Sequence, residues 1–85
     1  MKAKILNINN FHSTKKNQDY SIITVLRDIT QNERNRGIIG NFIAEELFLP
    51  DQLVNKFNAS HIDKECEVVY DVIGGKAVLS DVIVK

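Results

Sequence analysis

Residues 19–28, DYSIITVLRD, constrain the fold of this chain more than any other segment. They are rich in Ile, Val and Thr, which favour β-strands. In an extended chain, Ile22 and Leu26 point to one side and Ile23 and Val25 to the other. Both faces are therefore apolar, and the sequence predicts a strand that is covered on each side.

The chain of 85 residues is long enough for one domain and one small core. Hydrophobic residues make up 44% of it and charged residues 26%, which is typical of a folded domain rather than a disordered tail. We expect a single domain over residues 1–85.

Four further strands are predicted by β-branched composition and by alternation. They cover residues 2–9, 38–48, 65–73 and 76–85. Gly40 inside the third strand predicts a bulge or bend, and Gly74–Gly75 predicts a tight hairpin between the last two strands. Residues 10–18 are expected to form a polar connection and residues 29–37 a flexible loop.

One short helix is predicted between the third and fourth strands. Pro50 suits a first helical residue, Asp51 adds negative charge to the first turn, and Leu53 and Phe57 repeat at i, i+4. The order is then three strands, a helix and two strands, which is the order of the OB-fold, a five-stranded Greek-key barrel. An SH3-like barrel is the alternative, but it has no natural place for that helix.

Charge is distributed unevenly along a chain whose formal net charge is zero. Residues 1–44 contain seven basic and three acidic side chains, a net charge of +4, and residues 45–85 contain four basic and eight acidic ones, a net charge of −4. This asymmetry indicates a side that faces a polyanion, although chance clustering also occurs in so short a chain.

Binding of single-stranded nucleic acid needs cations for the phosphates and aromatic rings for the bases. An OB-fold places the connections around residues 15–16 and 29–37 beside the face of its second and third strands. The candidate phosphate contacts are Lys15, Lys16, Arg27, Arg34 and Arg36.

Tyr20 and Phe42 are the candidate stacking platforms, on the second and third strands. Alternatively, Tyr20 closes the rim of the barrel and Phe42 belongs to the core. The three remaining candidates, Phe48, Phe57 and Tyr70, lie in apolar register and are expected to be core residues.

The segment KKNQDYSI and the C-terminal segment GGKAVLSDVIVK resemble the small single-stranded-DNA-binding proteins of filamentous phages, the gene V type, and related proteins of mobile elements. The resemblance implies an OB-fold and a basic turn, Lys15 and Lys16, that precedes a base-stacking aromatic, Tyr20. This chain departs from the family at the last hairpin, where Gly74 and Gly75 replace an aromatic, and at Asp81, which replaces a basic residue.

Catalysis finds little support in the sequence. His12 and His61 have no further ligands at metal spacing, and Glu45 and Glu46 are adjacent on a strand, so they point to opposite faces. Cys66 alternates with charged residues, as a small buried hydrophobe would. We expect no enzyme, metal, cofactor or small-molecule substrate.

The partner expected from these features is single-stranded DNA, with RNA left open. A protein-interaction module that uses the acidic half, such as a host-factor inhibitor, is the alternative. The two-sided apolar strand and the resemblance both favour a homodimer. No segment suits a membrane span or a signal peptide, so we expect a cytoplasmic protein.

Overall fold

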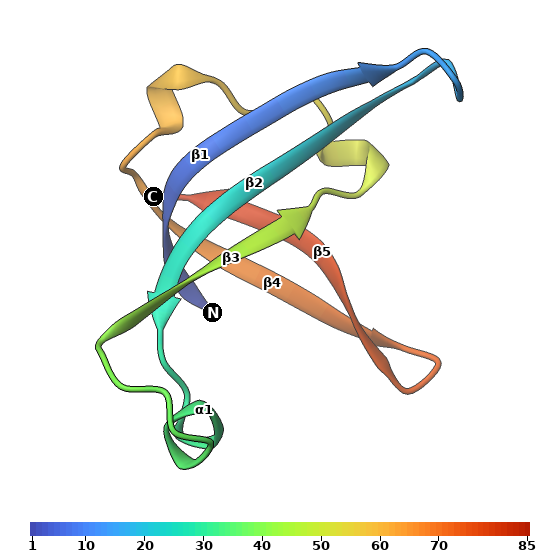
Figure 1. Ribbon diagram of the computed structural model, residues 1–85. Coiled ribbons are helices and arrows are strands. Elements are labelled where there is room, and N and C mark those ends of the chain that lie inside the picture. The colour runs from blue at the N-terminus through green and yellow to red at the C-terminus, as the bar shows by residue number, and fades with distance from the viewer.

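The computed structural model describes residues 1–85 as a five-stranded antiparallel open sheet with one short α-helix (Figure 1). The strands follow the order β3-β2-β1-β4-β5 across the sheet. Their bounds are β1 Lys2–Ser13, β2 Gln18–Asp28, β3 Phe42–Phe48, β4 Glu65–Ile73 and β5 Lys76–Val84. Helix α1, Gln31–Asn35, precedes β3, and two short 3-10 turns, η1 Asp51–Leu53 and η2 Ala59–His61, precede β4.

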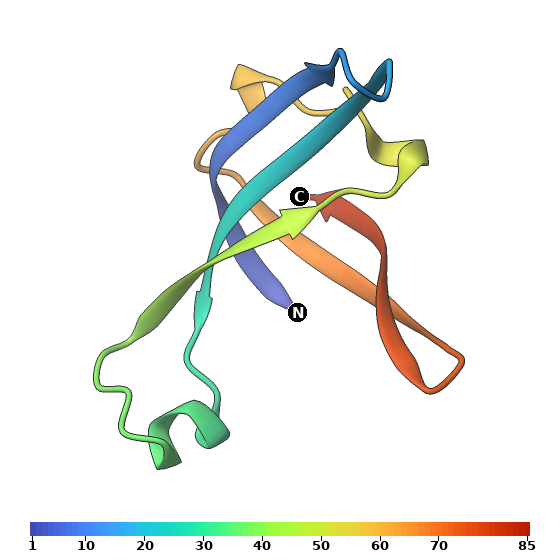
Figure 2. The same ribbon diagram turned by 45° about the vertical axis from the view of Figure 1, so that its right-hand side comes forward.

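Strand β1 joins the two parts of the sheet. It pairs with β2 along most of its length and with β4 through residues 2–4. The register with β2 shifts between Ile5 and Asn7, which leaves Leu6 as a bulge residue. A bulge increases bend and twist, and the β4–β5 hairpin accordingly crosses under the long β1–β2 hairpin (Figures 1 and 2).

The core lies on the concave side of this bent sheet. Ile5, Ile23, Val25, Val68 and Cys66 have almost no exposed surface. On β2 the buried residues are every second one, which is the alternation of a strand with one face inside. The predicted burial of Cys66 and Phe57 is confirmed.

A polar network fixes the chain between β3 and β4 to the core. The buried Ser21 hydroxyl donates to Asn10 Oδ1 at 2.5 Å and accepts from the Asn55 amide at 2.9 Å. Asn10 Nδ2 donates in turn to the Phe57 carbonyl at 3.1 Å. These bonds hold Phe57 in the core without a helix around it.

The predicted helix after Pro50 is therefore wrong. Only the three residues of η1 are helical, Val54 is extended, and Asn55 has a φ of +61°, a left-handed conformation that stops a helix. The hydrogen bonds to Ser21 and Asn10 stabilise this irregular path in place of helical ones.

The expected loop at 29–37 instead contains the α-helix. Thr30 and Glu33 form a capping box, in which the Glu33 amide donates to Thr30 Oγ1 at 3.2 Å and the Thr30 amide donates to Glu33 Oε1 at 2.9 Å. The Thr-x-x-Glu spacing is a sequence signal for a helix start that the lack of periodicity obscured.

The bounds of two strands also differ from those expected. Strand β1 continues to Ser13, so most of the supposed polar connection belongs to the β1–β2 hairpin. Strand β3 begins at Phe42, and Gly40 precedes it with a φ of +140° rather than forming a bulge within it. The hairpin at Gly74–Gly75 is confirmed, and both glycines have the positive φ that a tight two-residue turn needs.

We predict that Ile23→Ala lowers the free energy of unfolding by about 2–5 kcal/mol, because it leaves a cavity at a fully buried position. The matched control is Ile39→Ala at a side chain that is 96% exposed, where a change within about 0.5 kcal/mol is expected. Urea unfolding followed by circular dichroism measures both. Equal losses for the two variants would contradict the assignment of the core.

Candidate nucleic-acid interface

The convex face of β1, β2 and β3 has no covering element. In antiparallel strands, directly paired residues share a face, so the register places Ile22 beside Phe48 and Leu26 beside Ala44 and Lys4. All five of these side chains are at least partly exposed. We call this surface the outer face, and the residues of these three strands that form it are Lys2, Lys4, Asn7, Asn9, Phe11, Ser13, Gln18, Tyr20, Ile22, Thr24, Leu26, Asp28, Phe42, Ala44, Glu46 and Phe48.

Two aromatic rings stack at one end of the outer face. Phe11 and Tyr20 are paired across β1 and β2, and their ring centroids lie 5.6 Å apart at an interplanar angle of 30°. Phe11 was not among the predicted residues, because its segment was expected to be a polar connection. Phe11 is nine residues before Tyr20, and this spacing predicts that the two residues pair across a hairpin only if the residues of the turn are already known.

The predicted residues Lys15 and Lys16 lie in the β1–β2 turn, two residue pairs beyond this ring pair. Asn17 closes the turn with a φ of +49°, a conformation that Asn tolerates better than most residues. Neither lysine has a carboxylate within ion-pair distance. Lys15 and Lys16 lie at the same end of the sheet as Tyr20, with two residue pairs between the turn and the ring pair.

The acidic residue beside this turn, Asp19, is bonded to His12 and Asn55 rather than to the lysines. Asp19 Oδ1 lies 2.7 Å from His12 Nδ1, and Asp19 Oδ2 accepts from Asn55 Nδ2 at 3.1 Å. The hydrogen bond with His12 lowers the pKa of Asp19, and the bond from Asn55 adds to this effect. Asp19 thus contributes to the hairpin structure as well as placing a negative charge near the lysines.

Arg27 points to the opposite face and is not a free cation. Its Nη1 and Nη2 donate to the two carboxylate oxygens of Glu33 at 2.8 and 3.0 Å, and its Nε donates to Glu45. Hydrogen bonds to Glu33 and then Glu45 raise the pKa of Arg27. The predicted phosphate contact is thus a largely buried link between β2, α1 and β3.

Arg34 and Arg36 lie on and just after α1, at the far end of the molecule from the β1–β2 turn (Figure 1). Arg34 Nη1 donates to the Gly40 carbonyl at 3.1 Å, and Arg36 is exposed. Phe42 is near this end and 58% exposed, so the alternative that it is a core residue is wrong. Apart from Arg27, the predicted site residues form two groups at opposite ends of the molecule rather than one cluster.

Two aromatics that were expected in the core are exposed. Phe48 is 67% exposed on the outer face, opposite Ile22. Tyr70 is exposed on the β4–β5 hairpin, and partial burial together with the nearby Glu45 raises its pKa. Both residues were expected to be buried because their neighbours in the sequence are apolar. An apolar sequence pattern does not reveal where a strand extends past the core, or which of its two faces is uncovered.

No protein-family model matches this chain, and no curated protein or solved structure is detectably similar to it. None of its helices has the length and apolar character needed to cross a membrane.

The Arg27 cluster predicts a pH dependence. Hydrogen bonds from Arg27 and then Thr30 lower the pKa of Glu33 from 4.5 to about 2. Because the folded-state pKa is the lower one, this stabilisation is present above about pH 4.5 and is lost as the pH falls towards 2. We predict that the protection factors of the α1 amides, which are exchange rates corrected for the intrinsic rate at each pH, fall below pH 4, measured by hydrogen exchange and NMR.

Glu33→Gln should expose the α1 amides at neutral pH and remove this acid dependence. The control, Glu46→Gln, changes an exposed carboxylate on the outer face that has no ion pair, and it should behave as the wild type. If the acid dependence were unchanged in Glu33→Gln, it would have to arise from the titration of another group, which would contradict the role of Glu33.

Proposed function

We propose that this protein is a non-catalytic single-stranded-DNA-binding protein with an OB-fold, which coats DNA of a phage or other mobile element in the cytoplasm. The strand order supports the OB-fold, because β1 pairs with both β2 and β4 as it would in a five-stranded Greek-key barrel. The sheet is open, since β3 and β5 are its two edge strands and are not paired with each other. In that fold the face of strands 2 and 3 is the one that binds oligonucleotides.

The observation that carries the proposal is the aromatic outer face. Phe11, Tyr20, Phe42 and Phe48 all lie on one uncovered face of three strands. Exposed apolar patches of this kind mark binding surfaces, since they are unfavourable in water. Base stacking contributes about 1–3 kcal/mol per base and tolerates any sequence, because every base has a π-face.

The cations at the ends of this face support a polyanion rather than an apolar partner. Lys15 and Lys16 lie in the turn beyond the Phe11–Tyr20 pair, and Arg34 and Arg36 lie in the chain segment before β3, which begins at Phe42. RNA would meet the same cations and rings. A protein-interaction module is the second candidate, favoured by exposed apolar residues on the β4–β5 hairpin.

We predict tight binding to single-stranded oligonucleotides at low salt, weaker binding to duplex DNA, and a steep loss of affinity with added salt. Fluorescence anisotropy with labelled oligonucleotides of mixed sequence measures all three. Binding that is absent at low salt, or equal for duplex DNA, would contradict the proposal.

Variants should separate stacking from charge in the same assay. Tyr20→Ala should weaken binding at every salt concentration, whereas Lys15→Ala/Lys16→Ala should reduce the salt slope by up to about two phosphate contacts. Lys56→Ala/Lys76→Ala removes two exposed lysines from other parts of the chain and is the matched control. An unfolded Tyr20→Ala protein would instead support the barrel-rim alternative.

We further propose a homodimer. The sequence argument placed the partner over β2, but the exposed side of β2 belongs to the outer face. The β4–β5 hairpin offers a separate surface, because it projects away from the rest of the sheet (Figure 2). Tyr70 and Val72 are exposed on one face of this hairpin, and Ile73 and Val78 are exposed on the other. Two-fold pairing through the face that carries Tyr70 and Val72 would cover these two side chains and leave both outer faces free.

We predict a mass of twice 9.7 kDa by sedimentation equilibrium at micromolar concentration. Val72→Glu places a charge at a position that is 78% exposed in the single chain, and it should give a monomer. Phe48→Glu is the control on the outer face and should remain a dimer. A wild-type monomer would contradict the dimer, and a monomeric Phe48→Glu would place the partner on the outer face instead.

A further inference from the structure

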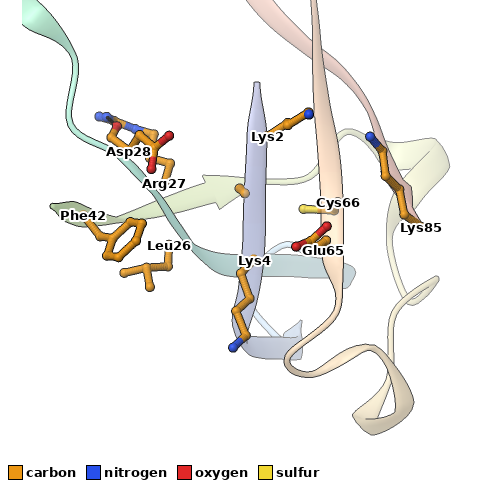
Figure 3. Close-up of a pocket in the computed structure, with 10 residues that line it drawn as sticks. Lys2, Lys4, Leu26, Arg27, Asp28, Phe42, Glu65, Cys66 and Lys85 are labelled. Atoms are coloured by element: carbon orange, nitrogen blue, oxygen red, sulfur yellow. Dashed lines mark hydrogen bonds between the residues drawn. The ribbon is translucent and has the colours of Figure 1, made fainter.

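A hollow of about 470 Å³ lies at the end of the outer face opposite the Phe11–Tyr20 pair. It is formed where β1, β2 and β4 meet. Leu26 and Phe42 line one side of it, with their side chains next to each other (Figure 3). Lys4 on β1 and Lys2 and Lys85 near β4 complete its cationic part.

The apolar side of this hollow suits a planar base. The Phe42 ring is more than half exposed and has no aromatic partner in the chain. The half-buried Leu26 lies beside it and extends the apolar surface. A nucleobase stacked on Phe42 would cover both side chains and remove their apolar area from water.

The charged side suits the phosphates that flank such a base. None of Lys2, Lys4 and Lys85 has a carboxylate within ion-pair distance. Asp28 and Glu65 also line the hollow, so the three lysines exceed the unpaired acids by one. Because the positive excess is small, the hollow is poorly suited to a bare anion. It is better suited to a ligand that is held by stacking together with a few phosphate contacts.

We propose that this hollow is a second nucleotide subsite, in which Phe42 and Leu26 hold a base and Lys4, with Lys2, contacts the neighbouring phosphates. The proposal rests on the function proposed above and extends it. One chain would then hold a strand at two places, the Phe11–Tyr20 pair and this hollow, with Ile22 and Phe48 between them.

The separation of the two places sets the length of nucleic acid required. Tyr20 and Leu26 are six residues apart on β2, which is about 20 Å at roughly 3.3 Å per residue. A strand with the ~3.4 Å rise of B-DNA covers that distance with about six nucleotides, and a stretched strand with fewer. Oligonucleotides of two or three nucleotides can occupy only one place at a time.

The test compares affinities for thymidylates of two to ten nucleotides, in the wild type and in Lys4→Ala/Phe42→Ala. The wild-type affinity should rise as the length passes about six nucleotides. In the variant this rise should be lost, and affinity for the ten-nucleotide ligand should fall at least about fivefold. Lys4→Ala alone should reduce the salt slope by about one, and Lys56→Ala is the control for a lost charge elsewhere.

NMR shift mapping on the wild type locates the ligand without any variant. Eight-nucleotide thymidylate should shift the amides of Lys4, Leu26 and Phe42 as well as those of Phe11 and Tyr20. Shifts confined to the Phe11–Tyr20 end, with an unaltered length dependence in the variant, would overturn the second subsite and leave the proposed function in place. Absence of binding at every length would overturn the proposed function itself.

Discussion

The whole structure depends on the pairing of β1 with two partners. Ala3 is paired on both sides, with Arg27 of β2 and with Cys66 of β4. The bulge at Leu6 comes three residues later in the same strand. Beyond Lys4, β1 leaves β4, while the Ile5 amide and carbonyl bond Lys64 and Asp63 of the preceding loop at 3.0 and 2.8 Å. The bend at this point turns the β4–β5 hairpin against the concave side of the β1–β2–β3 part, and a chain of this size has no second core with which to cover the convex side.

The two faces of β2 consequently have different roles. Ser21, Ile23 and Val25 are buried in the core, whereas Ile22 and Leu26 lie between exposed aromatics. A small domain has little stability in excess, so leaving three phenylalanines in water on one face favours a surface that is used in binding. On the concave side, Arg27 closes the end of the core by joining Glu33 and Glu45, which fixes the segment between β2 and β3 and with it the start of β3 at Phe42.

The sequence predicted the strands well and the environment of their side chains less well. The β-branched composition located β2, alternation located β4, and Gly74–Gly75 located the hairpin that leads into β5, because these signals are local. Alternation also shows that Ile22 and Ile23 face opposite sides, but not which side is inside when both are apolar. Lys15, Lys16 and Tyr20 lie at the same end of the sheet because they are close in the chain. Arg27 is different, since its partner Glu45 is eighteen residues away, and only the pairing of β2 with β3 brings the two together.

Charge alone would not hold a nucleic acid along this face. The sequence suggested a single basic side, but the folded chain neutralises Arg27 and puts Lys15 and Lys16 at one end and Arg34 and Arg36 at the other. Strand β2 separates these groups by about 35 Å at roughly 3.3 Å per residue, and the Debye length in physiological salt is only about 8 Å. Each pair of cations therefore attracts phosphates independently of the other. The middle of a bound strand would have to be held by stacking on the aromatic outer face, and stacking explains how a chain with no net charge could bind a polyanion without selecting its sequence.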